Sequence, residues 1–265
     1  LDLSNNQITE ISHYAFQNTK LISLTLRYNF LTVIPSLDVV APTLRSLSMT
    51  KNLVTSIGDE LARMEVLQSF GIRDNKVAKV DPQALRSSAS TITDIDLGHN
   101  QIKELDAAFF EGMHSLSSLV LQINSLARFP DFSRIRSANA LSRLYLNHND
   151  IEDLHETALE NMTYLQTLAL SNNELTRVPN LKDQRDSLRN LYLSYNQITT
   201  ISDDTFTGMR ISFLNLGNNG LSDLASLAPL NDYLEHLHLT GNDLGHMTSD
   251  DLLRFLIENK KVTTL

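Results

Sequence analysis

Short stretches of alternating apolar and polar residues recur along the whole chain. In one copy, Leu119 and Leu121 alternate with Ser118, Val120 and Gln122. Alternation with period two predicts a β-strand whose leucines face a core and whose other side chains face away from it. An asparagine follows each stretch, and successive asparagines are separated by 23 to 25 residues: Asn6, Asn29, Asn52, Asn75, Asn100, Asn124, Asn149, Asn173, Asn196, Asn219 and Asn242. The pattern therefore predicts one short strand per repeat.

Each predicted strand is too short to be stable alone, so neighbouring repeats must stack. Stacked copies of one strand form a parallel sheet, and parallel strands need a crossover connection, which the rest of each repeat supplies. The asparagines fit the turn after each strand, where backbone groups lie beside the apolar interior. Because an amide side chain offers donors and an acceptor together, we expect the asparagines to satisfy these backbone groups and not to form a functional site.

The crossover segments, which we call return segments, alternate between two types. One type has a large apolar residue nine or ten positions after the asparagine: Phe16, Leu61, Phe110, Leu159 and Phe206. The other type has a proline and reaches its apolar residue sooner: Pro35 with Leu37, Pro130 with Phe132, and Pro179 with Leu181. Because proline fixes φ and lacks an N–H, the second type predicts an extended segment, whereas the first has room for a turn or short helix. We expect all of these apolar side chains to lie in the core.

The last repeat is followed by a longer segment with a helical pattern. Ser249 is a suitable helix N-cap, and Leu252, Leu253, Leu256 and Ile257 follow at helical spacing. This segment predicts the one α-helix of the chain.

The repeated phrase LxxLxLxxNxL is complete in LISLTLRYNFL, LSRLYLNHNDI, LQTLALSNNEL and LRNLYLSYNQI. It resembles the leucine-rich repeat family, and the resemblance covers nearly the whole chain. The resemblance implies an α/β solenoid (horseshoe) with a concave parallel β-sheet and a convex face of short helices, turns and extended segments. The phenylalanine type of repeat is similar to the typical class in extracellular animal receptors and matrix proteins. We therefore expect an extracellular or cell-surface protein, with a cytoplasmic location as the alternative.

Length and composition add a few constraints. No linker or low-complexity stretch interrupts the repeats, so residues 1–265 are predicted to form a single domain. Both ends fall inside a repeat, and we expect a fragment that lacks its end caps. A formal charge of −9 argues against nucleic acid, and no apolar run is long enough to insert into a membrane. Asn161 begins an Asn-Met-Thr sequon and is a glycosylation candidate.

The sequence contains no catalytic constellation. With no cysteine there is neither a thiol nucleophile nor a zinc–thiolate site, and no phosphate-binding or nucleophile-elbow motif occurs. His236 and His238 share one strand face, but two imidazoles need a third ligand to hold zinc, so a solvated polar pair is favoured. Asp94 and Asp96 offer too few oxygens for calcium. We expect no enzyme activity, no metal and no cofactor.

Two groups of residues are candidates for protein binding, most of them at outward strand positions, with Ile123 and Tyr195 expected at the adjoining turn edge. Tyrosine and arginine are enriched in interface hot spots, although tyrosine also favours strands for its own packing. The first group combines aromatic and apolar residues with one arginine: Val120, Ile123, Arg143, Tyr145, Tyr192, Tyr195 and Phe213. The second group is basic and would suit an acidic partner or an anionic glycan, or is a solvated mixed-charge face: Arg27, Tyr28, Arg45, Lys51 and Arg73.

Together these features predict a non-catalytic module that binds a protein ligand on a concave sheet, as part of a receptor ectodomain or a secreted or matrix protein. A rigid sheet loses little conformational entropy on binding, which favours this use. The alternative is an intracellular scaffold or regulator with the same fold. The ligand and the oligomeric state are not encoded in the repeats.

Overall fold

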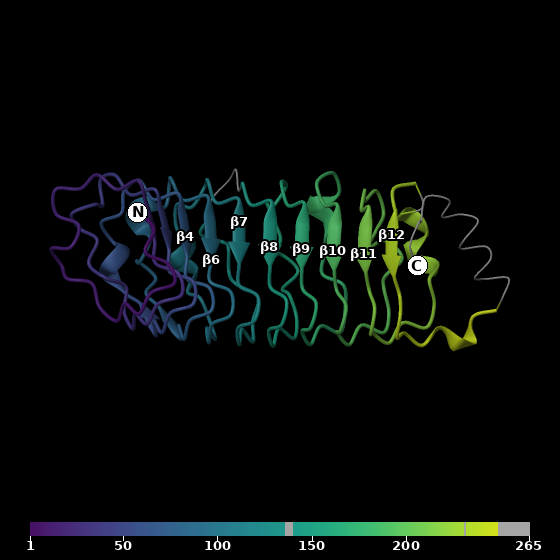
Figure 1. Cartoon of the computed structure of the whole chain (residues 1–265). Coiled ribbons are helices and arrows are strands. Elements are labelled where there is room, and N and C mark those ends of the chain that lie inside the picture. The colour runs from purple at the N-terminus through teal and green to yellow at the C-terminus, as the bar shows by residue number, and fades with distance from the viewer. Residues whose placement is uncertain (136–139, 231, 249–265) are drawn as a thin grey trace. The chain divides into compact units, whose positions relative to one another are not determined.

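Figure 1 shows the computed structural model of the chain, which describes residues 1–135, 140–230 and 232–248. The chain forms two compact units. The N-terminal unit comprises Leu1–Leu126 and Pro130–Leu141, and the C-terminal unit comprises Ala127–Phe129 and Ser142–Leu265. The expectation of a single domain stays a prediction.

Each unit is a stack of short parallel strands, one per repeat (Figure 1). In the N-terminal unit the strands pair in the order β1 (Ser23–Thr25), β2 (Ser46–Ser48), β4 (Ser69–Gly71), β6 (Asp94–Asp96) and β7 (Ser118–Val120). In the C-terminal unit they pair in the order β8 (Arg143–Tyr145), β9 (Thr167–Ala169), β10 (Asn190–Tyr192), β11 (Phe213–Asn215) and β12 (His236–His238). The middle residue of every strand is buried, as the alternating pattern predicts. The leucine-rich repeat solenoid is confirmed.

Within residues 1–135, 140–230 and 232–248, the return segments carry short elements only. Six 3₁₀ helices lie in these ranges: η1 (Asp59–Leu61), η2 (Arg86–Ser88), η3 (Ala107–Phe110), η4 (Lys182–Gln184), η5 (Ala225–Leu230) and η6 (Leu244–His246). A second, two-stranded parallel sheet joins β3 (Ser56–Ile57) to β5 (Lys79–Val80). No helix in the described part of the chain is long and apolar enough to cross a membrane. The α-helix predicted after Ser249 lies outside the described residues.

The aromatic residues of the return segments lie in the core, as predicted. Phe16, Phe110, Phe132 and Phe206 are all buried. The Phe110 ring lies 5.2 Å from that of Phe109 and 4.6 Å from that of Phe132, measured between centroids. The two types of return segment therefore meet in one aromatic cluster in the N-terminal unit.

One expectation about the proline-type segments was wrong in part. The chain around Pro179 has no helical structure, but η4 follows only three residues later. The side-chain Oδ1 of Asn180 accepts a hydrogen bond from the N–H of Lys182 at 3.1 Å, which supports this turn. Proline prevents a helix at its own position and does not prevent one after it.

The asparagines hold adjacent repeats together. The Oδ1 of Asn52 accepts a hydrogen bond from the N–H of Leu31 at 3.0 Å. Its Nδ2 donates to the carbonyl oxygens of Leu26 at 2.9 Å and Met49 at 3.0 Å. The same pattern of bonds recurs at Asn75, and Met49 accepts from both asparagines. The predicted structural role of these asparagines is borne out by their contacts.

The residue before each asparagine has a positive φ, which the sequence pattern did not indicate. This left-handed row includes one residue from every repeat: Asn5, Tyr28, Lys51, Asp74, His99, Ile123, His148, Asn172, Tyr195, Asn218 and Gly241. The conformation lets the N–H of this residue reach the next repeat, as the N–H of Lys51 does to the carbonyl of Arg73 at 2.9 Å. Asparagine and glycine tolerate this region, whereas a β-branched residue such as Ile123 is strained there.

We expect replacement of Ile123 with asparagine to raise the free energy of unfolding by about 1 kcal/mol, because Asn adopts φ near 55° at lower cost. The reverse change, Asn172→Ile at φ 56°, is the matched control and should lower it by a similar amount. Urea denaturation measures both. If Asn at position 123 destabilised the chain, the Ile123 side chain, although 37% exposed, would contribute more through packing than its backbone strain costs.

Candidate functional site

The sheet of the C-terminal unit carries a row of ring side chains on its open face. We call this side of each sheet, toward which the outward strand positions project, the sheet face. Tyr192 and Phe213 lie 4.8 Å apart between ring centroids. The Phe213 ring lies 5.3 Å from that of His238 and 5.8 Å from that of His236. With Tyr145 on β8, these five residues form what we call the aromatic row.

An alanine shows how closely the tyrosines of the row cover the sheet. Ala169 occupies an outward strand position, where solvent exposure is expected, yet only 2% of its surface is exposed. It is paired in register with Tyr145 on one side and Tyr192 on the other. Burial of its phenol, and secondarily the proximity of Tyr145, raise the pKa of Tyr192. The two tyrosines therefore cover Ala169, whereas Thr167, at the other outward position of β9, stays partly exposed.

Polar side chains beside the aromatic row are held in place by hydrogen bonds. Ser194 donates a hydrogen bond through its hydroxyl to that of Ser171 at 2.9 Å, and both residues are buried. The Oδ1 of Asn147 accepts a hydrogen bond from the N–H of Ser171 at 3.1 Å. These bonds hold the ends of β8, β9 and β10 in one arrangement, so the sheet face beside the rings is pre-formed.

The structure divides the predicted aromatic group. Tyr145, Tyr192 and Phe213 belong to the aromatic row, and Arg143 projects from β8 to the same side as Tyr145. Tyr195 lies in the turn after β10 and is 57% exposed, outside the sheet face. Val120 and Ile123 belong to the N-terminal unit, on β7 and in the turn that follows it.

The residues of the predicted basic group are spread over the turns and both ends of β2, and they do not form one cluster. The ammonium of Lys51 lies 4.8 Å from the centre of the Tyr28 ring, a cation–π contact. Arg27 donates through Nε to the Ser48 hydroxyl at 2.7 Å. Arg45 directly precedes β2, whereas Lys51 lies in the turn beyond its other end.

The remaining basic residue, Arg73, lies beside an acid. Its Nε is 3.5 Å from one carboxylate oxygen of Asp74, and the other oxygen of that carboxylate lies 3.2 Å from Nδ1 of His99. Arg73 is therefore partly neutralised, and the predicted basic face becomes a mixed-charge surface with one Tyr28–Lys51 pair.

The sheet face of the N-terminal unit contains a depression, whereas aromatic side chains occupy the sheet face of the C-terminal unit. A depression of about 250 Å³ lies over β2 and β4, floored by Ser46, Ser48, Ser69 and Gly71. Asp94 and Asp96 stand on one side of it. The outward positions of β2 and β4 carry serine and glycine, where β10 and β11 carry aromatic residues. The two sheet faces therefore differ in shape and in side-chain type.

The part of the chain that the structure describes contains no group of three or more His, Cys, Asp or Glu residues arranged to hold a metal ion. His236 and His238 instead pack against Phe213. Their membership of the aromatic row was missed from sequence. The available signal was the register of β11 and β12, which sets Phe213 opposite His236.

Comparisons with known proteins agree with this architecture. A family model described as Leucine rich repeat matches residues 66–126, 139–184 and 186–244. A second model, described as BspA type Leucine rich repeat region (6 copies), matches residues 1–75. The mouse protein "Leucine-rich repeats and immunoglobulin-like domains protein 2" is 27% identical over 125 residues, which are 47% of this chain and 12% of that protein. This chain therefore spans a small part of that relative.

Solved structures show the same fold over the full chain. An internalin (inlF) from Listeria monocytogenes superimposes with a TM-score of 0.79 and 25% identity, covering 100% of this chain and 72% of the internalin. The leucine-rich repeat domain of FLRT2, solved in an octameric complex with latrophilin 3 and Unc5D, gives a TM-score of 0.80 at 20% identity. That match covers 100% of this chain and 82% of the FLRT2 chain. With the family model matching more than half of its residues, the chain belongs to the leucine-rich repeat family.

Proposed function

We propose that this chain is a non-catalytic protein-binding module that holds a protein ligand on its sheet face. Leucine-rich repeat domains are protein-interaction modules and are typically non-catalytic. The observation that carries the more specific proposal is the aromatic row of the C-terminal unit. Its rings lie side by side on the sheet face and are only partly buried, so they leave apolar surface that a partner could cover.

The aromatic row has the properties of a binding hot spot. Tyrosine supplies a large apolar ring together with a hydroxyl that can donate or accept a hydrogen bond. The rings of Tyr192 and Phe213 already contact each other, so few rotamers remain to be lost when a partner binds. The acidic net charge of −9 favours a protein ligand over nucleic acid.

The structural neighbours support a role in protein complexes. FLRT2, which shares this fold, was solved together with two other proteins, latrophilin 3 and Unc5D. We infer from this likeness, together with the repeat type, that the chain belongs to a receptor ectodomain or to a secreted or matrix protein. An intracellular scaffold or regulator with the same sheet face is the second candidate.

Replacement of Tyr145 or Tyr192 with alanine should weaken binding of the protein ligand by about 1–2 kcal/mol each, as for central interface tyrosines. The ligand would be found by screening a library of cell-surface and secreted proteins, displayed on cells, with the tetramerised chain as bait. Affinities of the variants would then be measured by biolayer interferometry. Circular dichroism would verify that each variant is folded.

Tyr164→Ala is the matched control, because Tyr164 belongs to the same unit, lies before β9 and is 61% exposed. It should bind as tightly as the unmodified chain. Equal affinity of the Tyr145→Ala and Tyr192→Ala variants and the control for every ligand found would contradict binding at the aromatic row.

The proposed location leads to a separate test at Asn161. Asn161 and Thr163 are exposed on either side of the buried Met162, and the Asn161 backbone has φ 64° in a turn. We expect chain secreted from animal cells to carry an N-linked glycan here, seen as a mass increase that N-glycosidase removes and Thr163→Ala abolishes. Secreted chain with unmodified Asn161 would count against the site and favour the intracellular candidate.

A further inference from the structure

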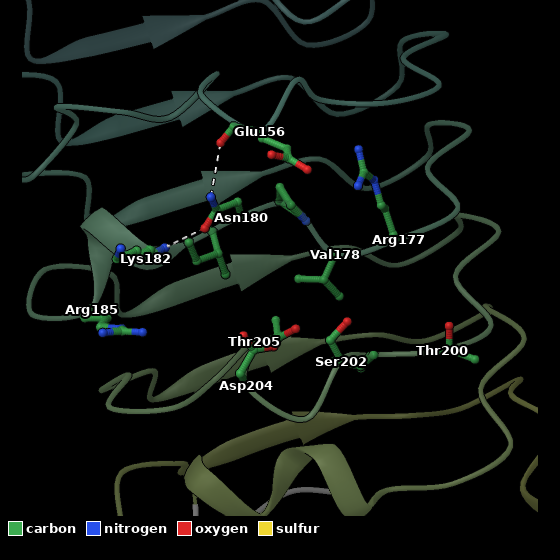
Figure 2. Close-up of a pocket in the computed structure, with 13 residues that line it drawn as sticks. Glu156, Arg177, Val178, Asn180, Lys182, Arg185, Thr200, Ser202, Asp204 and Thr205 are labelled. Atoms are coloured by element: carbon green, nitrogen blue, oxygen red, sulfur yellow. Dashed lines mark hydrogen bonds between the residues drawn. The ribbon is translucent and has the colours of Figure 1, made fainter.

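A second recessed surface lies on the return segments of the C-terminal unit, away from the strands. It is a pocket of about 610 Å³ between three successive return segments (Figure 2). Glu156 contributes from the first segment, residues 177–182 and Arg185 from the second, and residues 200–202, 204 and 205 from the third. We call this pocket the return-segment notch.

Pro179 removes one hydrogen bond that could close one wall of the notch. In the N-terminal unit, the return segments β3 and β5 pair as strands, and the N–H of Asp81 donates to the carbonyl of Ile57 at 2.8 Å. Pro179 follows Asn173 at the same spacing as Asp81 follows Asn75. Because proline has no N–H, the equivalent bond to the preceding return segment cannot form. The segments around Pro179 therefore do not close into a second sheet.

Other contacts hold the walls of the notch in place. Asn180 donates through Nδ2 to the carbonyl of Glu156 at 3.2 Å, which ties the first segment to the second. Arg177 forms two hydrogen bonds to the Asp153 carboxylate, at 3.0 and 2.9 Å. In Figure 2 the Arg177 side chain lies at one end of the notch and those of Lys182 and Arg185 toward the other. The notch is thus a fixed recess with polar groups around it.

The lining favours a ligand that is polar and uncharged. Cationic and anionic groups are nearly balanced, with Arg177, Lys182 and Arg185 set against Glu156 and Asp204. A charged ligand would meet attraction from one of these sets and repulsion from the other, so these two terms largely offset each other for a ligand of either sign. Hydroxyl groups are satisfied by both, because carboxylates accept hydrogen bonds from them and ammonium or guanidinium groups donate to them. Few apolar side chains are present to hold an apolar ligand.

We propose that the return-segment notch binds a neutral oligosaccharide. Adjacent hydroxyls of a sugar ring are spaced to pair with the two oxygens of a carboxylate or the two N–H groups of a guanidinium. Glu156, Asp204 and Arg185 offer such paired groups, and Val178 provides a small apolar surface for a sugar face. The notch is separate from the sheet face, so this proposal does not depend on whether a protein binds to the aromatic row.

The test uses the full chain, produced in bacteria so that it carries no glycan, with chitotriose, cellotriose and maltotriose as probes. Saturation-transfer NMR should show contact with at least one trisaccharide. Ser202→Trp fills the notch from its exposed rim and should weaken that binding by about tenfold or more. Asp203→Trp is the matched control, because Asp203 is the exposed neighbour of Ser202 and does not line the notch. It should bind like the unmodified chain.

A second pair of variants, Glu156→Gln and Asp204→Asn, tests the hydrogen-bonding argument without changing side-chain size. Each variant should bind the same trisaccharide more weakly than the unmodified chain does. The unfolding temperatures of both variants should match that of the unmodified chain. No saturation transfer to any of the three sugars would overturn the proposal. So would equal binding by Ser202→Trp, or tighter binding of a sulfated trisaccharide than of its neutral parent, since the latter would identify an anion site.

Discussion

Replacing Phe110 with alanine should lower the free energy of unfolding by about 3–5 kcal/mol. Phe110 is fully buried and contacts the rings of Phe109 and Phe132, so its loss removes a large transfer free energy and leaves a cavity. The packed side chains around such a cavity relax only partially, so most of this cost remains. Urea denaturation of the purified chain, followed by circular dichroism, measures the change.

The control for this prediction is Phe30→Ala. Phe30 is about half exposed, and its truncation should cost about 1 kcal/mol or less. A double-mutant cycle between Phe110 and Phe132 should also give a coupling of about 0.5–1.5 kcal/mol, as expected for rings in contact. A loss at Phe110 no greater than at Phe30 would contradict the aromatic core described above.

The second large effect is expected at Asn52. Alanine at this position leaves the buried N–H of Leu31 without its acceptor, and it removes one of two donors from Met49. An unsatisfied buried N–H costs about 1–3 kcal/mol, so with the weakened carbonyls we expect a total loss of about 2–4 kcal/mol. Amide hydrogen exchange should in addition show faster exchange at Leu31.

Asn190→Ala provides the comparison, because Asn190 projects from β10 and its side-chain Nδ2 donates a long hydrogen bond of 3.3 Å to the Thr167 hydroxyl. It should change stability by about 0.5 kcal/mol or less. Combining Asn52→Ala with Asn75→Ala should cost more than the sum of the single changes, because Met49 then loses both side-chain donors. Similar small losses at Asn52 and Asn190 would show that the asparagines do not link the repeats.

The strands, the core and the asparagine contacts could be predicted because each follows from a local rule. Period-two alternation places Leu119 inside and Val120 outside whatever the rest of the chain does. The asparagines recur beside buried turns, where an amide is the side chain that satisfies donors and acceptors together. These features depend on spacing within one repeat, and repetition makes the spacing easy to recognise.

Features that depend on which particular side chains and turns meet in the stack were missed. The burial of Ala169 arises from tyrosines on two other strands, and His238 joins the aromatic row because β12 lies beside β11. The positive φ of Ile123 violates its residue preference and is imposed by the turn that all repeats share. In each case the neighbouring repeat, and not the residue itself, decides the outcome.

The notch at Pro179 has the same origin. Proline predicts an extended segment at its own position, and its effect on the neighbouring segment follows only from comparison with the β3–β5 pair. Geometry also explains why some of the candidate residues lie together and others do not. Tyr192 and Phe213 meet because their strands are adjacent, whereas Arg45 and Lys51 lie beyond opposite ends of β2 and do not.

The central claim is that a protein ligand binds over the aromatic row, and site-directed photocrosslinking tests it most directly. A benzophenone amino acid placed at Tyr192 on the sheet face is compared with one at the exposed Tyr164 of the same unit, each incubated with the ligand found by screening. The account predicts a covalent adduct from position 192 and little from position 164. An adduct from position 164 alone would show that the ligand binds away from the aromatic row.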